Sequence, residues 1–352
     1  MLTCRRRGKG YSFLSPDEYP KISVIVPIKN EAKFIARTIG YIQNQDYPQD
    51  KLEIIIAAGD SDDNTDEIIT ELAKKDNRIK IINNPHGLSS AGRNIGAKNS
   101  TGEIITYIDG HTYIDNRDIL KNIIRLMAEK NVAVLSRPQF LDTPDNSYFQ
   151  RAVSLARKSP IGHGLDSTIY TREDKYVEPT SSGASYKKQV FEKLNGFDER
   201  FDACEDVDFN YRAAKSGYKS YTSMKLAVYY YPRKSLSTLF SQMARYGVGR
   251  FRLARKHPDS LSLGTLLPAS ITIGIPLLIL LAILVKPLFY PSIIILGLYT
   301  AGILLSSLAI SFKNGFSYLP VLPFIFPTIH FGMGWGFIKE LIQTIFGRGV
   351  KF

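Results

Sequence analysis

The 352-residue sequence predicts a mostly parallel α/β domain followed by a C-terminal transmembrane region. Two observations carry this prediction. Short β-branched apolar runs alternate with amphipathic helical patterns over residues 21–231, which is typical of a parallel sheet with flanking helices. Residues 265–338, in contrast, contain only two charged side chains, Lys286 and Lys313. Buried helices seldom run this long without charge, so this part is expected to enter a membrane.

The α/β domain is expected to begin with five strands and four helices. Apolar runs predict strands at residues 22–28, 53–58, 79–83, 103–108 and 132–136. Helical periodicity predicts helices at 31–43, 65–75, 89–98 and 116–130. Neither GxGxxG nor GxxxxGK[ST] is present, so dinucleotide and P-loop domains are unsupported.

Polar residues gather where these strands end. Lys29-Asn30-Glu31 follows the first strand, an Asp-rich turn at 59–63 follows the second, and Asp109-Gly110-His111 follows the fourth. In open α/β sheets, ligands bind outside the carboxyl ends of the strands. The ligand site is therefore expected at this edge of the sheet.

The stretch GDSDDNTDEIITE at 59–71 also has the acidic spacing of an EF-hand calcium loop. Two features count against calcium. Thr65 occupies the position where the EF-hand turn needs Gly, and the stretch follows a predicted strand instead of a helix. A helix start capped by Asn64 or Thr65 is the simpler interpretation.

Basic residues are concentrated in two segments. Residues 1–11 hold four Lys or Arg, and residues 232–258 hold seven, and neither segment has a carboxylate. The larger cluster directly precedes the first apolar span, as the positive-inside rule expects. Its pattern predicts an amphipathic helix on the membrane face. The alternative is a surface helix packed on the domain. A nucleic-acid protein would spread its basic surface over the folded domain, so no nucleic-acid partner is expected.

The expected organisation is a basic tail at 1–20, the α/β domain at 21–231, the basic amphipathic helix at 232–258 and the transmembrane region at 259–352. The apolar segments lie at 265–285, 288–312 and 316–338, the last interrupted by Pro320, Pro323 and Pro327. No secretory signal is recognisable, and the two cysteines form no disulfide framework. We therefore expect a multi-pass protein of the cell membrane with its α/β domain on the cytoplasmic side.

Five motifs in order carry a family resemblance over residues 21–256. They are VIVPIKNE, the Asp-rich turn at 59–65, GLSSAGRNIGAKNSTGEIITYIDGH, CEDVDF and QMARY. The series resembles membrane-anchored family 2 glycosyltransferases with a GT-A fold. The sequences DGH, SPIGHG at 159–164 and RYGVGR at 245–250 make it most similar to those of the succinoglycan glucosyltransferase type. The resemblance implies a Rossmann-like catalytic domain that uses a nucleotide-sugar, with a UDP-sugar expected.

The resemblance also implies a donor site. Pro27, Asn30, Glu31, Asp60 and Arg93 correspond to nucleotide contacts, although this acidic turn offers Asp60 one position later than the family pattern. The family's Asp-x-Asp metal motif corresponds to Asp109 and His111. Because imidazole replaces the second carboxylate, Mn²⁺ is favoured over Mg²⁺.

The reaction is expected at Glu205-Asp206. By resemblance Asp206 is the base that takes the proton of the acceptor hydroxyl in an inverting transfer, with Glu205 beside it. Gly183 corresponds to the acceptor-side loop. Gln242, Arg245 and Tyr246 correspond to the QxxRW motif near diphosphate and acceptor, with Tyr in place of Trp.

The expected function is transfer of a sugar to a lipid-linked saccharide at the membrane, in polysaccharide or glycan assembly. One alternative is a polyprenyl-phosphate glycosyltransferase, whose acceptor is lipid phosphate itself. Another is a non-catalytic membrane scaffold that binds a nucleotide-sugar. The sequence leaves open the sugar, the linkage, processivity, the number of spans and the oligomeric state.

Overall fold

The computed structural model describes residues 18–163, 169–179 and 183–352. Most of the predicted basic tail, residues 1–17, and Gly164 of the SPIGHG stretch lie outside the described residues. The chain divides into two compact units, each built from separated segments. Unit 1 comprises Met1–Gln139, Thr171–Phe197 and Phe209–Val228, and unit 2 comprises Phe140–Tyr170, Asp198–Asp208 and Tyr229–Phe352.

Unit 1 contains an eight-stranded sheet in the order β3-β2-β1-β4-β9-β6-β10-β8. The strands are β1 (Ile22–Ile28), β2 (Leu52–Ala58), β3 (Ile79–Asn83), β4 (Ile104–Tyr107), β6 (Val134–Ser136), β8 (Lys175–Val177), β9 (Gly183–Lys187) and β10 (Ser220–Thr222). β1 pairs in parallel with both β2 and β4, whereas β9 is antiparallel to β4 and β6. The predicted mostly parallel α/β sheet is thereby confirmed.

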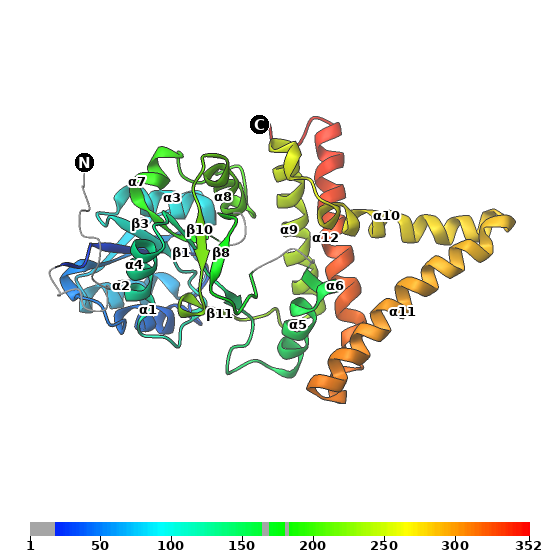
Figure 1. Ribbon diagram of the computed structural model, residues 1–352, viewed down its shortest axis with the longest axis horizontal. Helices are drawn as coiled ribbons and strands as arrows, with labels where there is room; N and C mark the ends of the chain where they lie inside the picture. Colours follow the sequence, from blue (N-terminus) through cyan, green and yellow to red (C-terminus); the bar gives the residue numbers. More distant parts are fainter. Residues whose placement is uncertain (1–17, 164–168, 180–182) are drawn as a thin grey trace. The chain divides into compact units, whose positions relative to one another are not determined.

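Helices of this part are α1 (Ile35–Gln43), α2 (Thr65–Lys75), α3 (Ser89–Asn99), α4 (Ile119–Glu129), α7 (Lys188–Lys193) and α8 (Glu205–Lys215), whose first four residues belong to unit 2 (Figure 1). Three short strands, β5 (Thr112–Tyr113), β7 (Gln139–Phe140) and β11 (Val228–Tyr230), form a second sheet. Short 3-10 turns occupy Gln49–Lys51, Met224–Leu226, Pro258–Ser260, Lys286–Leu288 and Phe316–Tyr318.

Two sequence expectations needed correction. The first helix begins at Ile35 instead of residue 31, because residues 31–34 form a turn closed by a 2.9 Å bond from the Phe34 amide to the Glu31 carbonyl. Gly183 begins strand β9, where a loop was expected, because residues 183–187 pair between β4 and β6. Glu31 therefore lies in the turn that leaves β1.

The core of unit 1 is built by burial along the strands. All seven residues of β1 are buried, and one cluster joins the strands to aromatic rings: Tyr107, Tyr186, Phe191, Phe197 and Phe209. Adjacent rings make edge-to-face contacts with centroids 4.9–6.3 Å apart, an arrangement that stabilises beyond the area buried. This rigid base fixes the loops at the sheet edge.

Unit 2 is helical. Its helices are α5 (Tyr148–Lys158), α6 (Pro160–His163), α9 (Leu236–Lys256), α10 (Leu263–Leu284), α11 (Phe289–Asn314) and α12 (Leu322–Ile345). α9 and α12 lie side by side, whereas α10 and α11 extend away from this pair (Figure 1). Leu239 and Met243 of the predicted amphipathic stripe are buried in a cluster with residues of α5, α11 and α12. The membrane-face placement of this helix stays a prediction.

Glycines allow α9 and α12 to approach closely. A Cβ on Gly332 would lie 3.0 Å from the Phe240 carbonyl oxygen, and one on Gly336 would lie 2.7 Å from the Ala244 carbonyl carbon. Such contacts are shorter than side chains tolerate, so these positions accept only hydrogen without a shift of the backbone.

Within the described residues, two helical stretches are long and apolar enough to cross a membrane by length and composition: Leu263–Leu284 and Lys286–Asn314. Many of their large apolar side chains are exposed, including Ile283, Leu298 and Leu305. The third predicted segment falls in α12, which has two prolines at or before its first turn and Pro327 inside it.

Candidate functional site

The strand order of unit 1 reverses between β1 and β4, and ligands of open α/β sheets bind outside the carboxyl ends of the strands at such a point. The turn after β1 carries Asn30 and Glu31, and the turn after β4 carries Asp109, Gly110 and His111. These segments lie 80 residues apart in sequence and meet here. The polar groups predicted at this edge are therefore brought together.

His111 and Glu31 form the central contact. The Nδ1 atom of His111 lies 2.6 Å from Oε1 of Glu31, with the imidazole side chain 36% exposed and the carboxylate 16% exposed. Gly110 permits this approach, since a Cβ there would lie 2.9 Å from Cγ of Glu31 and 2.9 Å from Cγ2 of Ile28. The Asp-Gly-His sequence thus sets the position of the imidazole.

Asp109 lies in a basic environment. Its Oδ1 atom accepts a 2.8 Å hydrogen bond from Nη2 of Arg93, whose side chain is only 14% exposed. Burial opposes ionisation, but the charges of Arg93, His111 and Arg137 outweigh it and lower the pKa of Asp109. Asp109 is therefore an anion held beside the mostly buried guanidinium of Arg93.

Arg137 is a site residue that the sequence interpretation missed. It directly follows β6, is 3% exposed, and donates a hydrogen bond from Nη2 to the Tyr107 carbonyl oxygen. Its position after a strand was the signal that could have found it, because the same rule identified Asn30 and Asp109.

The acidic turn at 59–65 supports the turn after β1. Oδ1 of Asn30, which has φ +57°, accepts a 2.8 Å bond from the Asp62 amide, and the Ala32 amide donates to Asp63 at 3.2 Å. Hydrogen bonding to Thr65 is the main cause that lowers the pKa of Asp63. The Asp63 carboxylate and the Asp62 amide therefore hold the acidic turn against the turn after β1.

The structure refines the expected caps and contacts here. Asn64 is at the N-cap of α2 but makes no side-chain capping bond; the Thr65 amide donates to Asp63 at 3.1 Å instead. Asp60 is exposed on the turn, and Pro27 is buried at the end of β1, where a Cβ on Gly92 would lie 3.2 Å from its Cβ.

Metal ligation at this edge depends on the donor atoms that the chain supplies there. No group of three His, Cys, Asp or Glu side chains that could hold an ion occurs in the part of the chain described. Two donors, Asp109 and His111, suit an ion whose other ligands are phosphate oxygens and water, as Mn²⁺ and Mg²⁺ have in nucleotide sites. A carboxylate bonded to Nδ1 orients a metal-binding imidazole that ligates through Nε2, and Glu31 is so placed. The residues therefore fit a divalent ion.

The second group of predicted residues lies in unit 2, at the start of α8. Cys204 precedes it with φ +68°, Glu205 is 6% exposed and Asp206 is partly exposed. Burial raises the pKa of the Cys204 thiol to about 12, and the nearby charges of Arg250, Asp206, Glu205 and Arg245 also act on it. The predicted base and the predicted diphosphate arginine thus share one neighbourhood.

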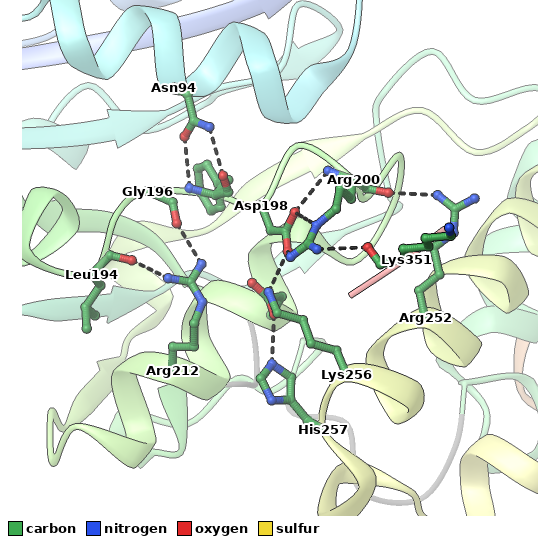
Figure 2. A network of polar contacts seen from close by, with 12 residues as sticks. Asn94, Leu194, Gly196, Asp198, Arg200, Arg212, Arg252, Lys256, His257 and Lys351 are labelled. Carbon is green, nitrogen blue, oxygen red and sulfur yellow. Dashed lines mark hydrogen bonds and ion pairs between the residues drawn. The ribbon is translucent and has the colours of Figure 1, made fainter. Parts of the chain in front are cut away.

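A polar network fixes this helix start (Figure 2). Asp208 is fully buried, and its Oδ1 atom lies 2.7 Å from Nζ of Lys256 and 2.8 Å from Nε2 of His257. Lys256 also lies 2.6 Å from Asp198, which pairs with Arg200 at 2.6 Å. Asp208 stands in the CEDVDF motif, but its partners lie about 50 residues away, so sequence alone did not reveal them.

The QxxRY residues lie on α9. Nε2 of Gln242 donates to the Tyr246 hydroxyl at 3.3 Å, one turn apart, and Arg245 is exposed. The guanidinium of Arg157 on α5 lies 5.8 Å from the centroid of the Tyr246 ring. Arg157 was also missed by the sequence interpretation, although it continues the apolar i, i+4 stripe of Phe149 and Val153.

Gly183 lies in unit 1 against Asn210 and Tyr186. A Cβ there would contact Oδ1 of Asn210 and lie 2.5 Å from the Tyr186 hydroxyl, which itself donates to Asn210 at 3.0 Å. Glycine is thus required at this strand start by packing. Its acceptor-side role stays a prediction.

The sequence is similar to glycosyltransferases of one family. Residues 23–194 match the family described as Glycosyl transferase family 2. The chain is 28% identical over 330 residues to a dolichyl N-acetyl-alpha-D-glucosaminyl phosphate 3-beta-D-2,3-diacetamido-2,3-dideoxy-beta-D-glucuronosyltransferase of Methanococcus voltae, covering 92% of this chain and 97% of that protein. It is 28% identical over 337 residues to the succinoglycan biosynthesis protein ExoA of Rhizobium meliloti, covering 94% of this chain and 98% of that protein.

Solved structures show the same fold. The mannosyltransferase PcManGT from Pyrobaculum calidifontis, in complex with GDP-Man and Mn²⁺, aligns with a TM-score of 0.57 at 18% identity, over 97% of this chain and 92% of that one. S. aureus TarS 1-349 aligns with a TM-score of 0.52 at 17% identity, over 92% of each chain. The resemblance seen in the motifs is thereby confirmed: residues 23–194 of this chain form a glycosyltransferase family 2 domain with the GT-A fold.

Proposed function

We propose that the protein is a membrane-bound, inverting, metal-dependent glycosyltransferase that moves a sugar from a nucleotide-sugar to a lipid-linked saccharide. The observation that carries this proposal is the cluster of Glu31, His111, Asp109 and Arg93 at the strand-order switch of unit 1. A relative of nearly equal length, the Methanococcus voltae enzyme, acts on a dolichyl-linked sugar phosphate by its name. The polysaccharide or glycan product of this chain is proposed on the same ground.

Donor binding is assigned to unit 1. Asn30, Glu31, Pro27 and Asp60 surround the nucleotide in this proposal, and Arg93 contacts the nucleotide or its phosphates. Arg137, whose charge acts on Asp109, adds a second cation beside the diphosphate. Orientation of the donor by these fixed groups lowers the entropy cost of reaching the reacting geometry.

The metal is assigned to Asp109 and His111. A bound Mn²⁺ or Mg²⁺ would neutralise the charge that develops on the diphosphate as the sugar departs. The imidazole ligand favours Mn²⁺, and the structurally similar PcManGT was solved with Mn²⁺. Glu31 fixes the ring so that Nε2 is directed for ligation.

Proton transfer is assigned to Asp206. Its carboxylate takes the proton of the acceptor hydroxyl as the new glycosidic bond forms, and one base suffices because the departing diphosphate needs no proton. Glu205 supports it, Arg245 contacts diphosphate, and Gln242, Tyr246 and Gly183 contact the acceptor side. The apolar helices α10 and α11 anchor the chain in the cell membrane, with the GT-A domain on the cytoplasmic side.

The test is release of nucleoside diphosphate by the full chain in native lipid extract, with a panel of UDP- and GDP-sugars and with Mn²⁺, Mg²⁺ or EDTA. Release from one donor, dependent on the metal and on the lipid extract, supports the proposal. Measurable donor binding without release under any condition would overturn it in favour of the non-catalytic scaffold.

A further inference from the structure

Arg157 is a buried cation in the last turn of α5. It is 8% exposed and follows Val153 and Ala156, which belong to the apolar cluster of unit 2. A guanidinium stays charged at any pH at which the protein is folded. Arg157 therefore places a permanent positive charge at the edge of an apolar cluster.

Three other cations of unit 2 are paired with carboxylates. Arg252 lies 2.8 Å from Glu340, Lys256 lies 2.7 Å from Asp208, and Arg200 lies 2.6 Å from Asp198. Arg157 makes no ion pair among the described residues, and its Nε atom has no hydrogen-bond partner among them. A buried charge without a counter-charge is costly, so an anion bound beside Arg157 would stabilise it.

The immediate neighbours of Arg157 are two phenols. The side chains of Tyr170 and Tyr246 are its hydrogen-bonding neighbours, and Gln242 in turn holds the Tyr246 hydroxyl. Both hydroxyls can turn to donate a hydrogen bond. The N–H groups of the guanidinium and the two O–H groups are therefore neighbouring hydrogen-bond donors. Such a set of donors suits a phosphate, whose oxygens accept several charge-assisted bonds at once.

We propose that Arg157, Tyr170 and Tyr246 form a binding site for the phosphate group that links the acceptor saccharide to its lipid. The identity of this ligand rests on the proposed function, whereas the phosphate chemistry rests on the contacts alone. Partly buried apolar side chains, among them Phe149 and Met333, pack against the adjoining cluster of α5, α9, α11 and α12, and apolar groups next to the charge suit a phosphate that carries a hydrocarbon chain. A second source of the same chemistry is the nucleoside diphosphate of the donor.

The experiment measures thermal unfolding of the full chain in detergent with three probes: geranylgeranyl phosphate, geranylgeraniol and UDP. The variants are Arg157→Met, which keeps the stem, and Arg157→Lys, which keeps the charge but loses the fork. Arg151→Met is the matched control, because Arg151 is exposed on the same helix and its side chain donates to the Asn146 carbonyl.

Wild type and Arg151→Met should be stabilised by several degrees by the prenyl phosphate and not by the prenol. Arg157→Met should unfold at the same or a higher temperature than wild type without ligand, because an unpaired charge is removed, and should lose the shift. Arg157→Lys should need about 10-fold more prenyl phosphate for the same shift, because a point charge replaces the fork.

Three results would decide against the proposal or its ligand. Equal shifts in wild type and both Arg157 variants would overturn the site. If the rise in unfolding temperature depends on Arg157 with UDP but not with prenyl phosphate, the lipid-linked ligand is overturned. The site would then belong to the donor. If Arg157→Met does not fold, Tyr246→Phe takes its place, and an unchanged prenyl phosphate affinity in that variant would again overturn the site.

The readout separates this inference from the proposed function. If prenyl phosphate raises the unfolding temperature in an Arg157-dependent way but no sugar is transferred, the phosphate site is supported and the proposed activity is contradicted. Normal transfer with an Arg157-independent acceptor KM leaves the activity standing while this inference fails.

Discussion

The Nδ1 atom of His111 lies 2.6 Å from Oε1 of Glu31, although the two residues are 80 positions apart in the chain. The contact joins the turn after β1 to the turn after β4 at the point where the strand order reverses. It fixes the orientation of the imidazole through one ring nitrogen, as a carboxylate does behind a metal-binding histidine. Its chemistry leads to the first prediction.

Replacement of Glu31 by Gln should weaken metal use. Loss of a carboxylate behind a metal-binding imidazole typically costs about 10–100-fold in metal affinity, because the ring loses its orientation and part of its basicity. Mn²⁺ titrations of diphosphate release, with Mn²⁺ binding followed by electron paramagnetic resonance, should show this shift. Glu67→Gln, an exposed acid on α2, is the control, and an unchanged Mn²⁺ requirement in Glu31→Gln would remove the metal role of His111.

Replacement of Arg93 by Met should weaken donor binding by about 10–100-fold, because Asp109 loses its 2.8 Å partner and the diphosphate loses a nearby cation. Calorimetric titration with UDP and GDP checks this. Arg78→Met removes a comparable 2.6 Å pair with Asp76 just before β3, away from the carboxyl ends of the strands. If both variants bind the nucleotide equally well, Arg93 is a structural residue only.

Replacement of Asp206 by Asn should lower kcat by about 10²–10⁴-fold with donor affinity retained, because the acceptor hydroxyl loses its base. Single-turnover transfer and donor binding should be measured side by side. Asp202→Asn, exposed four residues earlier, should behave like wild type. Full activity of Asp206→Asn would favour lipid phosphate as the acceptor, which needs no strong base.

Replacement of Glu53 by Gln should destabilise the sheet near neutral pH. Glu53 is 3% exposed; burial opposes its charge, but hydrogen bonds from Lys80, Ser23 and the Thr101 amide lower its pKa to about 2. The lowered pKa means that this stabilisation is complete above about pH 5 and disappears as the pH falls from the ordinary value of about 4.3 toward 2.

Hydrogen exchange of β1 and β2 amides measures that effect. The free energy of opening should fall by about 1–3 kcal/mol in Glu53→Gln at pH 7, as expected for hydrogen bonds to a charged group, and the difference from wild type should shrink below pH 4. Glu71→Gln, in a surface pair with Lys74, should change it by less than about 0.5 kcal/mol. A difference independent of pH would contradict the role of the Glu53 charge.

Replacement of Gly336 by Ala should separate α9 from α12. The added methyl group would lie 2.7 Å from the Ala244 carbonyl carbon and 2.9 Å from its Cα, so the helices must move at a cost of about 1–3 kcal/mol. Thermal unfolding in detergent should show a lower midpoint. Gly302→Ala on α11, where a Cβ would meet no atom within 4 Å, is the control and should not lower it.

The sequence by itself determined the alternation of strands and helices in unit 1. β1, β3 and α2 match their predicted ranges because their apolar periodicity is uninterrupted and their boundaries carry turn residues. It also placed Asn30, Glu31, Asp109 and His111 at one edge, since parallel strands must present their carboxyl ends together. The roles that the family motifs imply for Asp206 and Arg245 stay predictions.

Tertiary structure alone decided the pairings between distant segments. Antiparallel β9, inserted between β4 and β6, follows from hydrogen bonds that no local pattern encodes. The same holds for the contacts of Asp208 with Lys256 and His257, and for Arg157, whose neighbour Tyr246 is 89 positions away. The free-energy cost of burying a charge depends on the groups that the fold places around it. The role of such a residue can therefore be inferred only from the tertiary structure.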